Sequence, residues 1–136
     1  NAITSGLVGS EMCIRDSHWS ISHTDHGAVA VKSTGPYPIG VDMEPKSRLV
    51  DMGALDQIAT EEVKKQTPYP TNLETWMAIE AVSKATGHGR SISREISYSR
   101  GVWKLRGESW KVDFEQRLVG GVHHLVSIAR LITEAP

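Results

Sequence analysis

The segment Pro38 to Pro45, Pro-Ile-Gly-Val-Asp-Met-Glu-Pro, carries two carboxylates whose spacing could hold a small cation. Turn residues bound this segment, and its apolar residues alternate with period two, which predicts a short strand. Successive side chains on a strand point to opposite faces, so Asp42 and Glu44 share a face with Cα atoms roughly 6.5–7 Å apart. Both carboxylates can then reach one cation. The other interpretation is a solvated acidic face on a half-buried strand.

A second charged pair lies on the strongest helix of the sequence. Thr71 and Glu74 fit a capping box at its start, and Gly87 is well placed to end it. Glu80 and Lys84 are four residues apart, so they are neighbours one turn apart on this helix. By itself this pair can also be explained as an exposed ion pair worth a few tenths of a kcal/mol.

The chain before the acidic strand predicts a β-hairpin. Residues 18–22 and 28–33 alternate between polar and apolar side chains, and polar residues 24–27 separate them. Together with the acidic strand, this hairpin would form a three-stranded meander. His23 lies at the end of the first strand, where a histidine serves either as a local hydrogen-bonding residue or as a ligand-binding one.

The remaining elements complete an α+β pattern. Residues 51–65 predict one or two short amphipathic helices, and strand-like runs occur at residues 94–99, 102–105, 110–114 and 125–132. The adjacent His123 and His124 would point to opposite faces of a strand, and we assign them no role. The expected fold is therefore an antiparallel β-sheet packed against one long helix and one or two short helices.

Composition narrows the classes of protein. A chain of 136 residues fits one domain, and its formal net charge of −1 gives no basic field for nucleic acid. No apolar run reaches the length of a membrane span. The single cysteine, Cys13, excludes an internal disulfide and a cysteine-rich metal site, and it fits a reducing compartment. We therefore expect a cytoplasmic protein with neither a nucleic-acid nor a membrane partner.

Residues 1–17 stand apart from the rest of the chain. They show no clear periodicity, and the run Leu-Val-Gly-Ser-Glu-Met-Cys-Ile-Arg-Asp-Ser resembles a translated sequencing-adapter read. We expect this segment to be non-native and to lie outside the fold. The domain would then span residues 18–136, and the natural protein would extend upstream of about His18.

Three blocks of this sequence resemble the signature blocks of the 4′-phosphopantetheinyl transferases. They are Ser22-His23-Thr24, the acidic strand Ile39-Gly40-Val41-Asp42-Met43-Glu44, and Trp76-Met77-Ala78-Ile79-Glu80-Ala81-Val82-Ser83-Lys84-Ala85. Their order and rough spacing agree with the family over about residues 18–129. Because a Ser-His-Thr hairpin precedes the acidic strand, the chain is similar to the C-terminal lobe of the two-lobed, surfactin-synthetase-activating type, with its first lobe missing.

The resemblance implies a transferase that moves the phosphopantetheine arm of coenzyme A onto a serine of an acyl or peptidyl carrier protein. Asp42, Glu44 and Glu80 would bind Mg²⁺, which neutralises charge on the attacked diphosphate. Glu80 would also act as the base for the serine hydroxyl, directly or through water. Lys84 would face the anionic substrate, and the Ser22-His23 block would place His23 on a coenzyme A phosphate.

One position departs from the family pattern. The family has a lysine immediately before the helix glutamate, where this chain has Ile79. Loss of that lysine would remove a charge-assisted hydrogen bond worth about 1.5–3 kcal/mol, and we expect Ile79→Lys to raise any transfer rate unless residue 79 is buried. A missing lobe would weaken coenzyme A binding and expose apolar surface, which favours homodimerisation or aggregation. The alternatives are a non-catalytic relative that binds coenzyme A or a carrier protein, and an inactive structural fragment.

Overall fold

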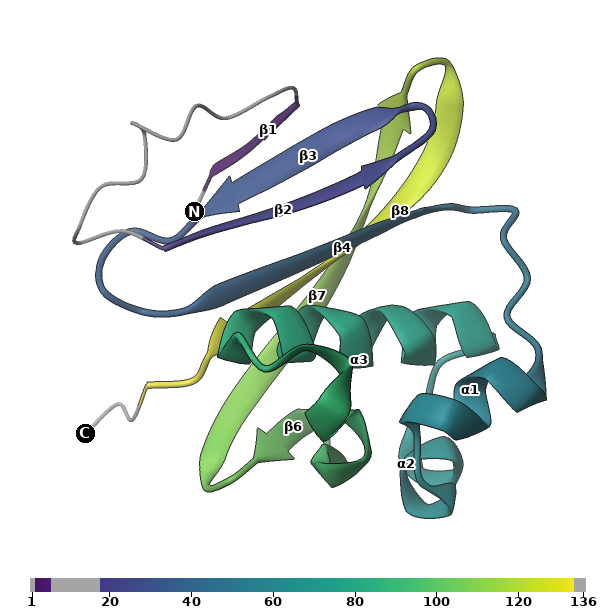
Figure 1. Cartoon of the computed structure of the whole chain (residues 1–136), viewed down its shortest axis with the longest axis vertical. Coiled ribbons are helices and arrows are strands. Elements are labelled where there is room, and N and C mark those ends of the chain that lie inside the picture. Colours follow the sequence, from purple (N-terminus) through teal and green to yellow (C-terminus); the bar gives the residue numbers. More distant parts are fainter. Residues whose placement is uncertain (1, 6–17, 134–136) are drawn as a thin grey trace.

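The protein has an α+β fold, shown by a computed structural model that describes residues 2–5 and 18–133 (Figure 1). The elements in chain order are β1 (Ala2–Ser5), β2 (Trp19–Thr24), β3 (Gly27–Lys32), β4 (Ile39–Pro45), α1 (Met52–Ile58), α2 (Glu61–Gln66), α3 (Asn72–Thr86), the 3-10 helix η2 (Gly89–Glu95), β5 (Ser97–Ser99), β6 (Val102–Leu105), β7 (Glu108–Val119) and β8 (Val122–Leu131). The expected α+β fold of antiparallel strands packed against one long helix and one or two short helices is confirmed, with α3 as the long helix and α1 and α2 as the short ones.

The strands form two antiparallel sheets instead of one. The smaller sheet has the order β1-β3-β2, and the larger has the order β4-β8-β7-β6-β5. The β2–β3 hairpin is confirmed, but the expected three-stranded meander is wrong because β4 pairs with β8, with Asp42 opposite Ser127. Alternation within a strand sets which residues share a face, but it does not specify a distant partner strand.

Two serine hydroxyl groups join the sheets where β2 runs beside β4 (Figure 1). The backbone N–H of Val41 donates to the Ser20 hydroxyl at 3.0 Å, and that of Met43 donates to the Ser22 hydroxyl at 3.0 Å. The two serine hydroxyl groups accept from backbone N–H groups on the outer edge of β4. No strand of the larger sheet pairs with that edge. The hairpin that carries His23 is thereby fixed to the acidic strand.

Both faces of β4 are covered, which gives the molecule three layers. One face packs on the small sheet through an apolar cluster whose members are Val29, Val31, Ile39, Val41, Met43, Val119, Val126 and Ile128. The other face lies against α3, which crosses β4 and β8 (Figure 1). Alternation along β4 therefore directs Asp42 and Glu44 toward α3, as its period of two predicts.

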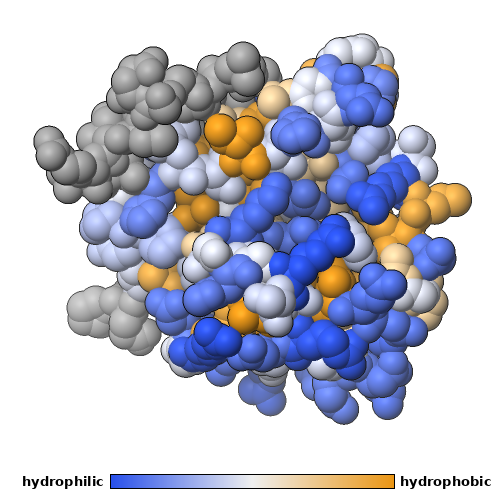
Figure 2. All heavy atoms as spheres, viewed as in Figure 1, coloured by the Kyte–Doolittle hydropathy of each residue, from blue (hydrophilic) through white to orange (hydrophobic). Residues whose placement is uncertain are grey.

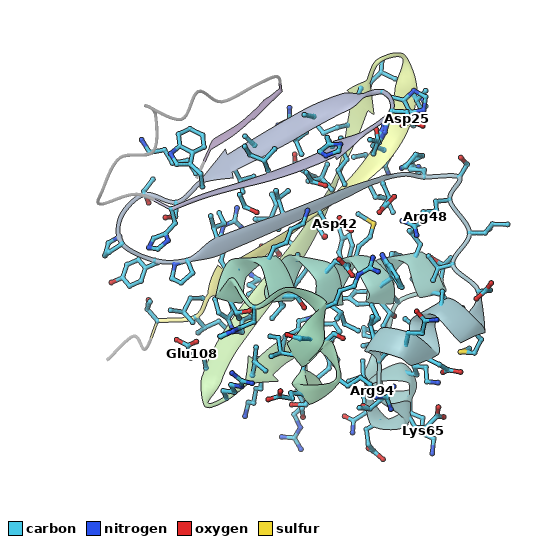
Figure 3. The ribbon with its side chains drawn as sticks, in the orientation of Figure 1. Asp25, Asp42, Arg48, Lys65, Arg94 and Glu108 are labelled. Atoms are coloured by element: carbon cyan, nitrogen blue, oxygen red, sulfur yellow. The ribbon has the colours of Figure 1, made fainter. Side chains whose placement is uncertain are left out.

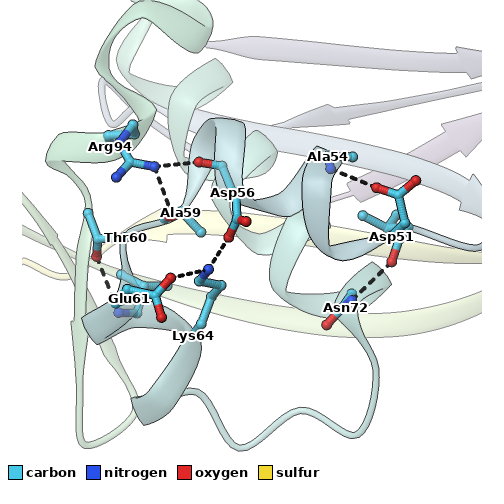
Figure 4. Close-up of polar contacts among 11 residues, drawn as sticks. Asp51, Ala54, Asp56, Ala59, Thr60, Glu61, Lys64, Asn72 and Arg94 are labelled. Atoms are coloured by element: carbon cyan, nitrogen blue, oxygen red, sulfur yellow. Dashed lines mark hydrogen bonds and ion pairs between the residues drawn. The ribbon is translucent and has the colours of Figure 1, made fainter.

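The long helix begins and ends as its sequence predicts. The Glu74 carboxylate accepts from the Thr71 backbone N–H at 3.1 Å, and Gly87 ends the helix with a left-handed φ of 78°. The two short helices are capped by Asp51 and Thr60. Arg94 of η2 binds the carbonyls of Asp56 and Ala59 at the end of α1, which ties these helices to the 3-10 segment after α3 (Figure 4).

Three boundary expectations need correction. Residues 1–17 were expected to lie outside the fold, yet Ala2–Ser5 pair with β3; residues 1 and 6–17 lie outside the described part. The strand expected from residue 94 starts at Ser97, because η2 continues through Glu95. Strand β8 begins at Val122, so both histidines lie inside it.

Among the described residues, no helix is long and apolar enough to cross a membrane.

Candidate functional site

Asp42 lies in the interface between β4 and α3 (Figure 3). Its exposed fraction is 6%, and the Oδ2 atom is buried without a hydrogen-bond partner. The solvated acidic face weighed from the sequence is therefore wrong at this residue. Gly40, two residues earlier on the same face, allows the close approach, since a Cβ there would lie 2.0 Å from the Ala81 carbonyl oxygen. Helix and strand together cover the Asp42 carboxyl group.

This environment destabilises the ionised form of Asp42. Burial raises its pKa to about 7, Lys84 opposes this shift, and the nearby carboxylates of Glu44 and Glu80 add to it. Both other predicted metal ligands, Glu44 and Glu80, therefore lie within electrostatic range of Asp42. A buried carboxylate oxygen without a donor, next to two further acids, is favourable for a cation.

Glu44, two residues after Asp42 on the same face of β4, lines a surface groove of about 380 Å³. The groove is lined by residues of the β2–β3 turn and the end of β4: His23, Thr24, Asp25, His26, Glu44, Pro45, Ser47 and Arg48. Arg48 forms an ion pair with Glu44 at 2.6 Å. The fold thus brings His23 and Glu44, which are 21 positions apart in the sequence, to one groove.

Glu80 does not pair with Lys84 in this structure. It is held by Arg90 of η2, whose Nε donates to Glu80 Oε1 at 2.9 Å. Lys84 instead reaches across to β4, with its Nζ 3.8 Å from Asp42 Oδ1, and donates to the Ile21 carbonyl at 3.4 Å. The expected exposed pair along the helix is replaced because each side chain finds a partner on another element. Lys84 therefore joins the acidic strand, the helix and the hairpin.

Two predicted positions are enclosed by the fold. Ser22 is buried, and its hydroxyl group already accepts from Met43. Ile79 is 1% exposed and packs in the apolar core below α3. A lysine at residue 79 would place its stem in this core, so the expectation that Ile79→Lys raises a transfer rate no longer follows.

The site also contains residues that the sequence did not single out. Arg48 and Arg90 lie 5.3 Å and 5.0 Å from the centre of the Trp76 ring. Ser127 is opposite Asp42 on β8, and its hydroxyl donates to the Met77 carbonyl at 2.9 Å. The four-residue spacing of Glu44 and Arg48 is the one local signal, but a spacing of four brings side chains together on a helix, and these two residues lie in β4 and the loop after it. No local pattern links Arg90 to Glu80.

The donor set suits a hard divalent cation. Mg²⁺ takes oxygen ligands, usually from a few carboxylates, and Asp42 Oδ2 has a free acceptor. Within residues 18–133, no three His, Cys, Asp or Glu side chains are arranged as a ready metal site. Glu44 and Glu80 are held instead by the two arginines. Asp42, Glu44 and Glu80 fit Mg²⁺ in chemistry and proximity, provided that these arginines release the glutamates.

A scan against models of known protein families finds none that matches this chain, and a search of curated proteins finds no relative.

Hydrophilic side chains gather over the region where β4 and α3 lie, on the face that Figure 2 presents. The functional assignment must come from this region and its geometry.

Proposed function

We propose that this chain is a lobe of a magnesium-dependent 4′-phosphopantetheinyl transferase, acting on coenzyme A and a carrier-protein serine. One observation carries the proposal. Asp42 has a buried, unpartnered oxygen and lies within electrostatic range of Glu44 and Glu80, and Glu44 lines a groove that also contains His23. The three sequence blocks that resemble the family thus contribute to one contiguous region, although they are far apart in the chain.

Each residue has a role that its position supports. Asp42, Glu44 and Glu80 would hold Mg²⁺, which supplies charge neutralisation at the attacked diphosphate. Glu80 sits on α3 with its side chain 14% exposed, so it can reach the hydroxyl group of an incoming serine as a base. Lys84 offers a cation at the edge of the site, and His23 lines the groove where a coenzyme A phosphate would lie.

The second candidate is a relative that binds coenzyme A or a carrier protein without transfer. The observation that favours it is Ile79, which is buried where the family has a lysine next to the helix glutamate. Without that lysine, the diphosphate would depend on Lys84 and the two arginines for charge neutralisation. Coenzyme A binding in the absence of transfer would select this candidate.

The deciding experiment is mass spectrometry of an apo carrier protein after incubation with this protein, coenzyme A and Mg²⁺. The transferase predicts a mass gain of one phosphopantetheine unit on the carrier serine, and chelation of Mg²⁺ should remove the gain. Asp42→Asn should also abolish transfer, whereas Asp113→Asn, at an exposed residue of β7 outside the groove, should retain it. The absence of transfer by a folded protein that binds coenzyme A would contradict the transferase.

The expected homodimer and cytoplasmic localisation remain predictions. Sedimentation velocity over a range of concentrations would test the first. A monomer at every concentration would contradict the expectation of self-association through exposed apolar surface.

A further inference from the structure

The charges of the site balance in the structure. Each of its three acids has a cation partner, with Asp42 near Lys84, Glu44 bound to Arg48 and Glu80 bound to Arg90, at 3.8, 2.6 and 2.9 Å. A divalent cation that entered alone would have to displace these partners and leave cations unpaired. An anion that entered alone would leave carboxylates unpaired. The arrangement therefore favours a ligand that brings both signs of charge.

The two arginines share an anchor that is separate from their glutamates. Both guanidinium groups lie over the ring of Trp76, which is 4% exposed and one helical turn before Glu80. Arg48 comes from the segment after β4, and Arg90 comes from η2. An arginine that stacks on an aromatic ring keeps that contact while its N–H groups change partners, because the ring and the acceptor use different parts of the guanidinium.

We propose that Arg48 and Arg90 are positioning residues that exchange partners on ligand binding. In the unliganded protein they hold Glu44 and Glu80. When a divalent cation takes the two carboxylates, the arginines remain over Trp76 and bind the oxygen atoms of a phosphate group of the substrate. This inference rests on the proposed metal site, and it specifies the substrate as a metal-bound phosphate or diphosphate.

The exchange makes cation and anion binding cooperative. Phosphate binds the arginines and frees the glutamates, so it should tighten Mg²⁺ binding, and Mg²⁺ should tighten phosphate binding by the same factor. Removal of one arginine should change the affinity for Mg²⁺ alone and the effect of phosphate on that affinity in opposite directions. Mg²⁺ alone should bind more tightly, because one glutamate is already free, and the benefit from phosphate should decrease.

The test is calorimetric titration of the 136-residue chain with Mg²⁺, with and without inorganic phosphate. In the wild-type protein, we expect saturating phosphate to tighten Mg²⁺ binding by roughly fivefold or more. In Arg48→Gln and Arg90→Gln, Mg²⁺ alone should bind several-fold more tightly, and phosphate should change the affinity less than about twofold. Arg106→Gln is the matched control, because it removes the same charge from an exposed pair with Glu95.

A second measurement follows the arginines directly. The Nε–Hε NMR signals of Arg48 and Arg90 should shift when Mg²⁺ and phosphate are both present, and much less with either alone. Far-UV circular dichroism checks that both variants are folded. We expect both to fold, because the side chains of Arg48 and Arg90 are partly exposed.

The outcomes separate the inference from the function on which it rests. If the wild-type protein binds Mg²⁺ through Asp42 and both arginine variants bind it with unchanged affinity and coupling, partner exchange is wrong and the metal site stands. If the wild-type protein binds no Mg²⁺ at millimolar concentrations, with or without phosphate, the metal site is wrong and the inference fails with it.

Discussion

Asp42 combines two properties that conflict, since a carboxyl group is ordinarily ionised at neutral pH and the fold buries this one. Its neighbours do not resolve the conflict, because Lys84 is 3.8 Å from one carboxylate oxygen and the other has no donor. A buried carboxyl group that keeps one oxygen without a partner is more consistent with a ligand-binding role than with a stabilising one. We therefore expect its replacement to improve stability while it removes function.

The raised pKa of Asp42 predicts a definite pH dependence. The pKa rises from 3.8 to about 7 on folding, so the folded protein retains a proton that the unfolded chain has lost between these values. Stability of the metal-free protein should therefore fall as the pH increases from about 4 to about 7. Asp42→Asn should remove this loss and be more stable than the wild type at pH 8, by up to about 4 kcal/mol, with little difference at pH 4.

Urea unfolding from pH 4 to pH 8 would measure this difference. Asp25→Asn, which removes the same charge from the exposed β2–β3 turn, is the matched control. A wild-type protein that is the more stable of the two at pH 8 would show that Lys84 stabilises the ionised Asp42 more than burial destabilises it.

Ile79 gives a prediction of decreased stability. It is an apolar residue at the position where the 4′-phosphopantetheinyl transferases have a lysine. Its side chain is 1% exposed within the core below α3. Ile79→Lys should lower stability by about 3–5 kcal/mol, since an unpaired ammonium group would have to enter that core. Leu49→Lys, at a residue that is 93% exposed, should be close to neutral. Thermal unfolding of both variants tests this, and an unchanged melting temperature for Ile79→Lys would show that residue 79 can reach solvent.

At the scale of elements, the contact between β4 and α3 brings the acids together. Gly40 is the residue that permits it, because a Cβ there would lie 2.0 Å from the Ala81 carbonyl oxygen and 2.6 Å from the Ala85 nitrogen. Both of these are backbone atoms, so side-chain adjustment cannot relieve the clash. The separation of helix and strand, and with it the distance between Asp42 and Glu80, depends on this glycine.

Gly40→Ala should therefore push α3 away from β4. We expect a loss of about 3 kcal/mol or more in unfolding free energy, together with weaker Mg²⁺ binding. Gly53→Ala in α1 is the control, because its Cβ would meet only Asp51 at 3.4 Å and helix propensity favours alanine by about 1 kcal/mol. Denaturant unfolding compares the two. Equal stability of the Gly40 variant and the wild type would contradict the close packing.

At the scale of the whole molecule, His124 connects the two sheets. It is fully buried on β8, its Nε2 lies 3.0 Å from the Thr24 hydroxyl at the end of β2, and its Nδ1 lies 2.8 Å from the Val122 carbonyl. A carbonyl only accepts, so Nδ1 donates, and in the neutral imidazole Nε2 then accepts from the Thr24 hydroxyl. The β2–β3 turn, which lines the groove with His23, is thereby held against the larger sheet.

His124→Ala should detach this turn as well as leave a cavity. We expect a loss of about 2–4 kcal/mol, with faster amide exchange in β2 and β3 than in β7. The adjacent His123→Ala provides the control, because His123 is exposed on the opposite face of the same strand. Hydrogen exchange followed by NMR distinguishes the two. Uniform destabilisation without selective exchange in β2 and β3 would show that His124 fills space but does not clamp the turn.

Local sequence determined much of this protein. The shared face of Asp42 and Glu44, the start and end of α3, the two short helices and the β2–β3 hairpin all follow from periodicity, capping and turn residues, which act over a few positions. For the same reason, the sequence identified the acids that the fold later brings together.

Only the tertiary structure decided how those acids are held. The pairing of β4 with β8, the burial of Asp42, the partners of Glu80 and Lys84, and the enclosure of Ile79 each depend on residues distant in the chain. Local periodicity cannot specify them, because burial and charge pairing depend on which elements pack together and how closely. The electrostatics of the site are therefore a property of the contact between strand and helix, and they cannot be derived from either segment alone.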